Sequence, residues 1–133
     1  MIVLDTHALI WLSDAQRTLG KAARRLSDRA LLKSELCVSA ISFWEIGLLA
    51  AKQRVRFKTS PTELRQGALR AGIREIALDG DMGIHAANLH SLHDDPADRL
   101  IVATALMHDA VLITADERIL EWRGPLKTHD ARE

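Results

Sequence analysis

The stretch His93–Thr114, HDDPADRLIVATALMHDAVLIT, joins an acidic opening to two apolar runs. Asp95 followed by Pro96 is typical of a helix start, because aspartate caps the first turn and proline suits the first helical position. The longer run, Leu100–Leu106, predicts a helix that is fully buried. The short run Val111–Thr114 has no polar alternation and predicts a strand buried on both faces. A buried helix that leads into a buried strand indicates an α/β protein.

The same alternation of short apolar runs and helical patterns extends along the whole chain. Runs that predict further strands are Ile2–Leu4, Leu36–Ser39 and Glu75–Leu78, with a weaker one at Leu126–Thr128. Helical spacing of apolar residues covers Leu19–Leu32, Ile41–Lys52 and Thr62–Ala71, the last with Ser60 as its cap, and a turn at Asp79–Asp81 leads into a short helix ending near Leu92. This order favours a parallel sheet covered by helices.

Length and charge limit the classes of protein that remain. A chain of 133 residues suits one domain, residues 1–133, and its formal net charge of zero points to neither nucleic acid nor membrane. The first residues, MIVLDTHALIWLSD, lack a basic segment, and Asp5 interrupts their apolar run. We therefore expect neither a signal peptide nor a membrane span. The single cysteine, Cys37, predicts a buried core residue and fits a reducing cytoplasm.

Acidic residues follow the predicted strands at similar places. Asp5 comes directly after Ile2–Leu4, Glu45 lies in the first turns of the helix after the second strand, and Asp116 follows Val111–Thr114. Ligands of open parallel sheets bind at the carboxyl ends of the strands. Asp98 opens the helix that precedes the last of these strands, so it joins the others only if the fold brings that helix end to the same edge.

Each acid also has a purely structural interpretation. Asp5 can cap a helix that begins at Thr6 or His7, and Asp98 favours the first turn of its own helix. Glu45 fits a capping box with Ser42, whereas a cap at Ser39 would leave it without that role. Asp116 can belong to a turn. Taken one at a time, these structural interpretations are favoured.

Taken together, the four carboxylates point to a metal site. Clustered carboxylates repel one another, and burial disfavours their charged form, so the cluster costs stability unless a cation offsets it. Oxygen ligands without cysteine or histidine fit Mg²⁺ or Mn²⁺ better than Zn²⁺. Such a site can activate water against a phosphodiester. The chain has no nucleophile elbow, Walker-type loop or CxxC pair that would indicate other chemistry.

Four blocks of the sequence together resemble the PIN-domain family and, within it, the VapC-type toxins of bacterial toxin–antitoxin pairs. The blocks are IVLDTHALIWLSD, VSAISFWEIGLLAAK, LHDDPADRLIVATAL and LITADERI, and their order and spacing match over nearly the whole length. The resemblance implies a three-layer α/β/α sandwich around a parallel sheet of four or five strands. It also implies hydrolysis of RNA with Mg²⁺ or Mn²⁺, leaving a 5′-phosphate and a 3′-hydroxyl, together with a cognate antitoxin and a homodimer.

The resemblance also assigns roles to individual residues. Asp5 and Asp98 would be direct metal ligands, Glu45 and Asp116 would complete the cage and orient the attacking water, and Thr6 and Thr114 would support them. Family members often carry an aromatic residue where this chain has Ala97, a difference of packing that should leave activity intact.

The remaining residues of the opening stretch have roles outside the metal cage. Asp95 is expected to cap its helix. For Arg99 an ion pair that fixes the helix is favoured over a phosphate contact. His93 and His7 would contact RNA or be polar surface, without a metal role.

Other residues have weaker interpretations. Two interpretations remain open for a set of basic residues: they form a track that binds RNA, which is slightly preferred, or they are a solvated surface. These residues are Arg24, Arg25, Arg29, Lys52, Arg54, Arg56 and Lys58. Trp11, Trp44 and Trp122 are expected in the core or at a subunit interface, Trp44 packing its helix and not stacking on a base. An antitoxin's amphipathic segment would bind the first two helices and Ile46–Ala51, although core packing explains those residues equally well.

Two other classes of function compete with a toxin ribonuclease. A phosphoacceptor receiver would need an acidic pair after its first strand and a late lysine, and a dehalogenase-type phosphatase would need a second aspartate where His7 stands. Neither pattern is present. A PIN fold that binds RNA or a partner without toxin activity remains the alternative.

Overall fold

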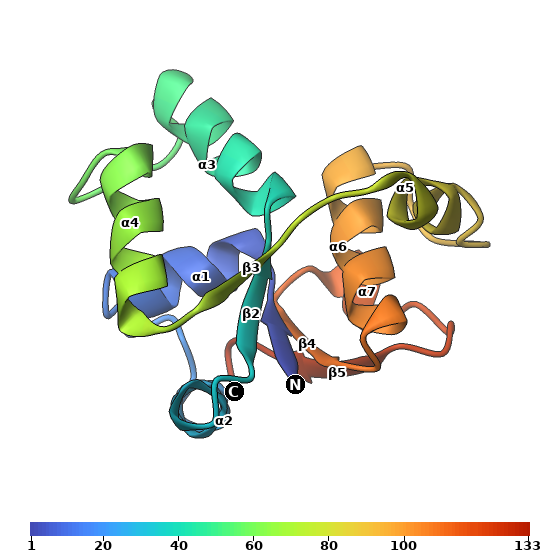
Figure 1. Ribbon diagram of the computed structural model, residues 1–133, viewed down its shortest axis with the longest axis horizontal. Helices are drawn as coiled ribbons and strands as arrows, with labels where there is room; N and C mark the ends of the chain where they lie inside the picture. Colours follow the sequence, from blue (N-terminus) through green and yellow to red (C-terminus); the bar gives the residue numbers. More distant parts are fainter.

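A five-stranded parallel sheet forms the centre of the computed structural model, which describes all 133 residues (Figure 1). The strands are β1 (Ile2–Leu4), β2 (Leu36–Ser39), β3 (Arg74–Ile76), β4 (Val111–Thr114) and β5 (Lys127–Asp130), and they lie in the order β3-β2-β1-β4-β5. The chain moves outward from β1 to β3 on one side and then returns to place β4 on the other side of β1. The topological switch point therefore lies between β1 and β4, where ligands bind in such sheets.

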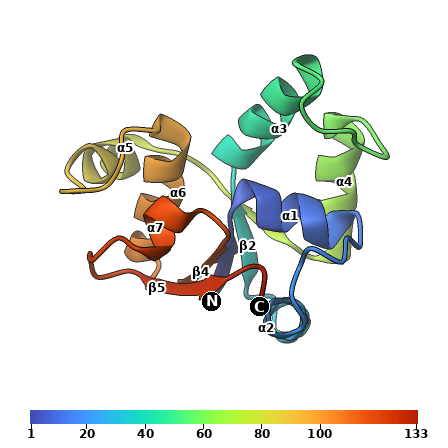
Figure 2. The ribbon, with the colours of Figure 1, turned by 180° about the vertical axis from the view of Figure 1, so that it is seen from behind.

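Helices cover both faces of this sheet (Figures 1 and 2). On one side lie α1 (Thr6–Ser13), α2 (Lys21–Leu32), α3 (Ile41–Ala51) and α4 (Pro61–Ala71), and on the other lie α5 (Gly80–Ala87), α6 (Pro96–Met107) and α7 (Glu117–Leu120). The predicted three-layer α/β/α sandwich with a parallel sheet is confirmed. None of the helices combines the length and apolar character needed to cross a bilayer.

The side chains of β1 explain why its sequence has no polar alternation. Ile2 and Leu4 pack into a cluster of 16 buried residues with α1, α2 and α4, whereas Val3 packs into a second cluster of 13 with α5, α6 and α7. Both faces of the strand are therefore buried, as in other parallel sheets.

The edge strands and the short helix differ from their predicted bounds. Strand β3 begins at Arg74, not Glu75, and stops at Ile76, where its carbonyl accepts the Ala40 N–H and the chain leaves the sheet. Strand β5 runs two residues beyond Thr128 because it pairs with the full length of β4. Its side chains are exposed or half-buried and so gave little apolar signal. Helix α5 ends at Ala87, five residues before Leu92.

Capping residues set the starts of the helices largely as expected. Asp5 caps α1 and Asp95 caps α6, with Pro96 as the first helical residue. Ser60 forms a capping box with Glu63 at the start of α4, and Pro61 follows it. Local sequence therefore determines these three helix starts, two of which carry acids at the carboxyl edge of the sheet.

Candidate functional site

A hollow of about 410 Å³ lies at the switch point between β1 and β4. Carboxylates line it from four places in the fold: Asp5 after β1, Glu45 on α3, Asp95 and Asp98 at the start of α6, and Asp116 after β4. The structure therefore brings the four predicted acids together. It adds Asp95, which we expected only as a cap. The N-terminus of α6 reaches the same edge of the sheet, as the placement of Asp98 required.

Asp5 is the most buried of these acids, with 7% of its surface exposed. Its Oδ1 accepts the Ala8 N–H at 2.8 Å, which is the cap of α1, and its Oδ2 accepts the hydroxyl of Thr114. The Thr114 oxygen in turn accepts the Asp116 N–H at 3.1 Å. Thr114 thus links two acids on adjacent strand ends.

Glu45 is held by α1 and not by its own helix. The Thr6 hydroxyl donates to Oε1 of Glu45 at 2.5 Å and lies 3.0 Å from the Ser42 hydroxyl oxygen. The prediction of a capping box between Ser42 and Glu45 is wrong, because α3 begins at Ile41 and both residues lie too far into the helix. The alternative prediction, a helix cap at Ser39, comes close to what the structure shows, because the Ser39 hydroxyl accepts the Ile41 N–H at 3.3 Å. Glu45 is therefore available to the hollow.

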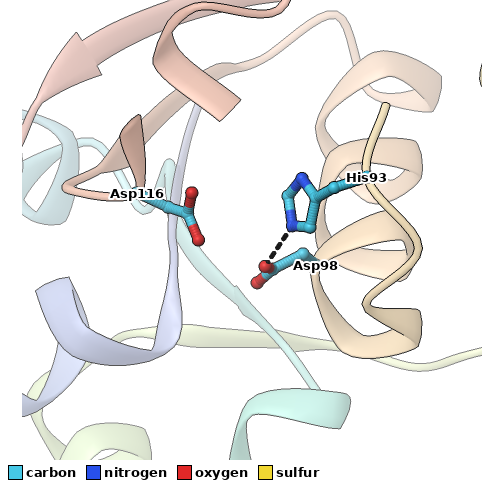
Figure 3. A group of neighbouring side chains, drawn as sticks. All are labelled: His93, Asp98 and Asp116. Atoms are coloured by element: carbon cyan, nitrogen blue, oxygen red, sulfur yellow. Dashed lines mark hydrogen bonds and ion pairs between the residues drawn. The ribbon is translucent and has the colours of Figure 1, made fainter. Parts of the chain in front are cut away.

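Asp98 has a histidine partner that the sequence did not indicate. Nε2 of His93 lies 2.7 Å from Oδ2 of Asp98, and Asp116 points toward the same space from the opposite side (Figure 3). Ligand atoms of His93, Asp98 and Asp116 lie within 4.8 Å of one another, as do carboxylate oxygens of Glu45, Asp95 and Asp98. Asp98 thus belongs to both groups and joins the two halves of the hollow.

Two arginines lie in the hollow, and both already have acidic partners. Arg118 binds both oxygens of Asp116, at 3.3 and 3.0 Å, and reaches Asp98 at 3.7 Å. Arg132 pairs with Asp130 at 3.2 Å. Arg118 was not predicted from the sequence. The one signal that could have placed it at the site is its position two residues after Asp116, a predicted metal ligand.

Three of the clustered carboxyl groups, those of Asp5, Glu45 and Asp98, have raised pKa values. Burial raises the pKa of Glu45 to about 7, helped by the charges of Asp98, Asp95 and Asp5, and raises that of Asp98 to about 6. Burial also raises the pKa of Asp5. Although burial opposes it, Arg118 lowers the pKa of Asp116. At neutral pH the hollow therefore carries a mixture of protonated and charged acids, as expected where no cation offsets their repulsion.

Comparison with known proteins identifies the fold family. The PIN-domain family model matches residues 2–124. The chain belongs to the PIN-domain family. It is 34% identical to ribonuclease VapC22 of Mycobacterium tuberculosis over 125 aligned residues. The alignment covers 93% of each of the two chains. Within its family the chain is therefore of the VapC type.

Solved structures give the same fold for this PIN domain. VapBC2 from Rickettsia felis, bound to a DNA fragment from its promoter, matches with a TM-score of 0.67 and 16% identity over 97% of this chain and 98% of that one. DNA-bound VapBC from Salmonella typhimurium matches with a TM-score of 0.67 and 19% identity, over 97% of this chain and 96% of that one. At such low identity these likenesses establish the fold alone.

The donor set of this PIN domain fits a hard divalent cation. The groups that converge are carboxylate oxygens with one imidazole nitrogen, and the chain's only cysteine is buried in the core elsewhere. Oxygen donors of this kind suit Mg²⁺ and Mn²⁺. A bound cation would also favour the charged forms of Asp5, Glu45 and Asp98, whose pKa values are raised without it.

The expectation that Arg99 forms an ion pair is wrong. Its guanidinium donates instead to five backbone carbonyls, two at the end of α5 and three in the loop before α6: Ala86, Ala87, Leu89, Leu92 and His93. The distances range from 2.7 to 3.3 Å. A planar group with five N–H donors can bind several carbonyls at once, and the carbonyls of an irregular loop need such donors. Arg99 therefore holds the loop that carries His93.

Replacing Arg99 with methionine should lower the free energy of unfolding by about 3 kcal/mol or more, because the carbonyls of the loop lose charged donors. Arg99→Lys should recover part of the loss, since an ammonium group cannot reach all five carbonyls. Urea unfolding followed by circular dichroism would measure both changes. Arg29→Met on the exposed face of α2 is the control and should change stability by less than about 0.5 kcal/mol. Equal stability of the Arg99→Met and Arg29→Met proteins would contradict this role.

Other residues differ from their predicted surroundings. His93 is not polar surface, because only 15% of its side chain is exposed and it binds Asp98, whereas His7 is exposed at the rim of the hollow. Trp11 also lines the hollow. Trp44 is not a core residue, since 56% of it is exposed. Trp122 is half-buried and its indole donates to the His90 carbonyl at 2.9 Å.

The predicted basic track does not form one continuous surface. Lys52 and Arg54 lie beside the acids, in a second hollow that also includes Glu45. Arg24 donates to the Gln16 carbonyl at 3.4 Å, and Lys58 donates to the Asp14 carbonyl at 3.0 Å. The basic residues of α2 lie on a helix far from α3 (Figure 1). Only two of the seven basic residues therefore border the candidate site.

Proposed function

We propose that this protein is a metal-dependent endoribonuclease that hydrolyses RNA phosphodiester bonds. The observation that carries the proposal is the convergence of Asp5, Glu45, Asp98 and Asp116 in one hollow at the switch point of the sheet. The likeness to a named ribonuclease over 93% of the chain supports the choice of substrate class. A reducing cytoplasm, where RNA is abundant and Cys37 stays a thiol, is the location that fits this activity.

The residues of the hollow would divide the work among them. Asp5, Asp98, Asp116 and Glu45 would hold Mg²⁺ or Mn²⁺, which would supply positive charge against the phosphate and lower the pKa of water. Thr114 and Thr6 orient Asp5 and Glu45 through their hydroxyls. Arg118 keeps Asp116 ionised. Glu45, with one carboxylate oxygen not engaged by Thr6, would help to orient the attacking water.

A cognate antitoxin is the partner we propose for this nuclease. A hollow of about 560 Å³ lies between α1, α2 and α4 and includes the apolar side chains of Leu12, Leu31, Leu64 and Ile73. Its shape between helices suits an amphipathic helix of a partner. Of the surface predicted for that partner, Ile46 does not take part because it is fully buried. The likeness to VapBC complexes supports this assignment, and a homodimer stays an expectation.

Incubation of the purified protein with single-stranded RNA tests the activity most simply. Cleavage should need Mg²⁺ or Mn²⁺, stop with EDTA, and leave products with a 5′-phosphate that a phosphate-dependent exonuclease degrades. Cleavage that continues in EDTA, or products with a 2′,3′-cyclic phosphate, would contradict the proposal. If RNA remains uncut with either metal, the alternative of a PIN-fold binding module would be favoured.

A further inference from the structure

A second hollow lies beside the acidic one. It has a volume of about 190 Å³ and lies between α3 and the start of α6. Glu45 and Asp95 line both hollows, so the two are neighbours that share a wall. A chain that runs through the acidic hollow across Asp95 would therefore enter this second space, which we name the Trp44 groove after its largest side chain.

The wall of the Trp44 groove offers a surface for a flat ring. Trp44 exposes 56% of its surface, and Leu48 beside it in the groove is half-buried. Pro96 and Ala97 at the start of α6 also line the groove. An indole exposed to this degree next to a polar site indicates ligand binding and not packing of the core. Nucleic-acid bases stack on such rings whatever their sequence.

The charges around the two hollows differ in a way that fits a polyanion. The arginines of the acidic hollow, Arg118 and Arg132, are already paired with acids. Lys52 and Arg54 line the Trp44 groove, and both are exposed with no ion pair or side-chain hydrogen bond. Free cations beside a carboxylate cluster offset its repulsion of phosphates. The groove therefore combines a stacking surface with unpaired positive charge, as single-strand binding sites do.

We infer that the Trp44 groove binds the RNA strand on one side of the cleaved phosphodiester. One base stacks on Trp44, while Lys52 and Arg54 contact the phosphates that follow. This inference rests on the proposed ribonuclease function and adds the place where the substrate strand leaves the acidic hollow. It also reverses our expectation that Trp44 merely packs its helix.

Binding of a fluorescein-labelled uridine 12-mer to the intact protein tests the inference, with Asp98→Asn as the background in every variant so that the RNA is not cut. Trp44→Ala should weaken binding about tenfold in fluorescence anisotropy, and Trp44→Phe should restore most of it because an aromatic face remains. The double variant Lys52→Gln, Arg54→Gln should reduce the slope of log affinity against log salt by about 1.4, or about 0.7 for each lost phosphate contact. The α2 double variant, Arg25→Gln on α2 with Lys33→Gln directly after it, removes the same charge and should leave both quantities unchanged.

Three outcomes would overturn the inference. A Trp44→Ala protein that binds RNA as tightly as the background protein is the first. A loss of salt dependence that is larger in the α2 double variant than in Lys52→Gln, Arg54→Gln is the second. A change of oligomeric state in Trp44→Ala, measured by light scattering, would place the groove between two copies of the chain. If the wild-type protein cuts RNA while Trp44→Ala binds it unchanged, this inference fails and the proposed function stands. If the wild-type protein neither binds nor cuts RNA, both fail.

Discussion

The Asp98→Asn protein should cut RNA more than a hundredfold more slowly than wild type, yet its metal-free form should be more stable. Asp98 belongs to both groups of converging ligand atoms, and losing a metal ligand costs more than the 10- to 100-fold typical of an outer partner. Asparagine keeps an oxygen that can accept from His93 but removes one repelling charge. With a pKa of about 6 in the folded protein, the ionised Asp98 carboxylate lowers stability at pH 8, so its removal should add roughly 1–3 kcal/mol.

Initial rates of RNA cleavage and thermal unfolding in EDTA would measure the two effects on the same preparation. Asp94→Asn is the matched control, because Asp94 lies in the loop just before α6, is exposed and forms no side-chain hydrogen bond. It should leave both quantities near wild type. An Asp98→Asn protein that cuts RNA normally, or that is less stable than wild type without metal, would contradict the assignment.

Stability of the metal-free protein should fall as pH rises from about 4.5 to 7.5. Glu45 has a pKa of about 7 in the folded protein, above its ordinary 4.5, and Asp98 about 6, above 3.8. The folded chain therefore binds more protons than the unfolded chain in this range, and stability is lost as these carboxyl groups ionise. The expected loss is a few kcal/mol. Mg²⁺ at millimolar concentration should raise the unfolding temperature at pH 8 and do little at pH 5, where protons compete for the same oxygens.

Differential scanning calorimetry at several pH values, with EDTA or Mg²⁺, would measure this dependence. The double variant Glu45→Gln, Asp98→Asn is the control and should show a flatter pH profile and almost no response to Mg²⁺. A wild-type protein whose metal-free stability rises between pH 5 and pH 8 would be inconsistent with repulsion in the hollow.

Strong local signals in the sequence account for most of the fold that was predicted. Strands β1, β2 and β4 are buried on both faces, so their short apolar runs marked them at their observed bounds. Strands β3 and β5 are edge strands with partly exposed side chains, and their ends depend on pairing with a neighbour. Such pairing is a tertiary effect that no local pattern contains.

The candidate site shows the same division between local and tertiary information. Asp5 and Asp116 could be placed because each directly follows a strand of the predicted sheet. The Thr6–Glu45 and His93–Asp98 contacts join elements or loops whose relative positions the sequence does not specify. Arg99 was misassigned for that reason, since its partners are carbonyls of a loop and carbonyls carry no sequence signal.

The central claim is that carboxylates distant in sequence form one site for a divalent cation, and titration with Mn²⁺ followed by electron paramagnetic resonance tests it most directly. The signal of free Mn²⁺ should disappear as wild-type protein binds the ion. It should persist with Asp5→Asn, in which asparagine still caps α1 but a ligand charge is gone. Asp94→Asn should bind like wild type. Equal binding by wild type and Asp5→Asn, or no binding by either, would contradict the account.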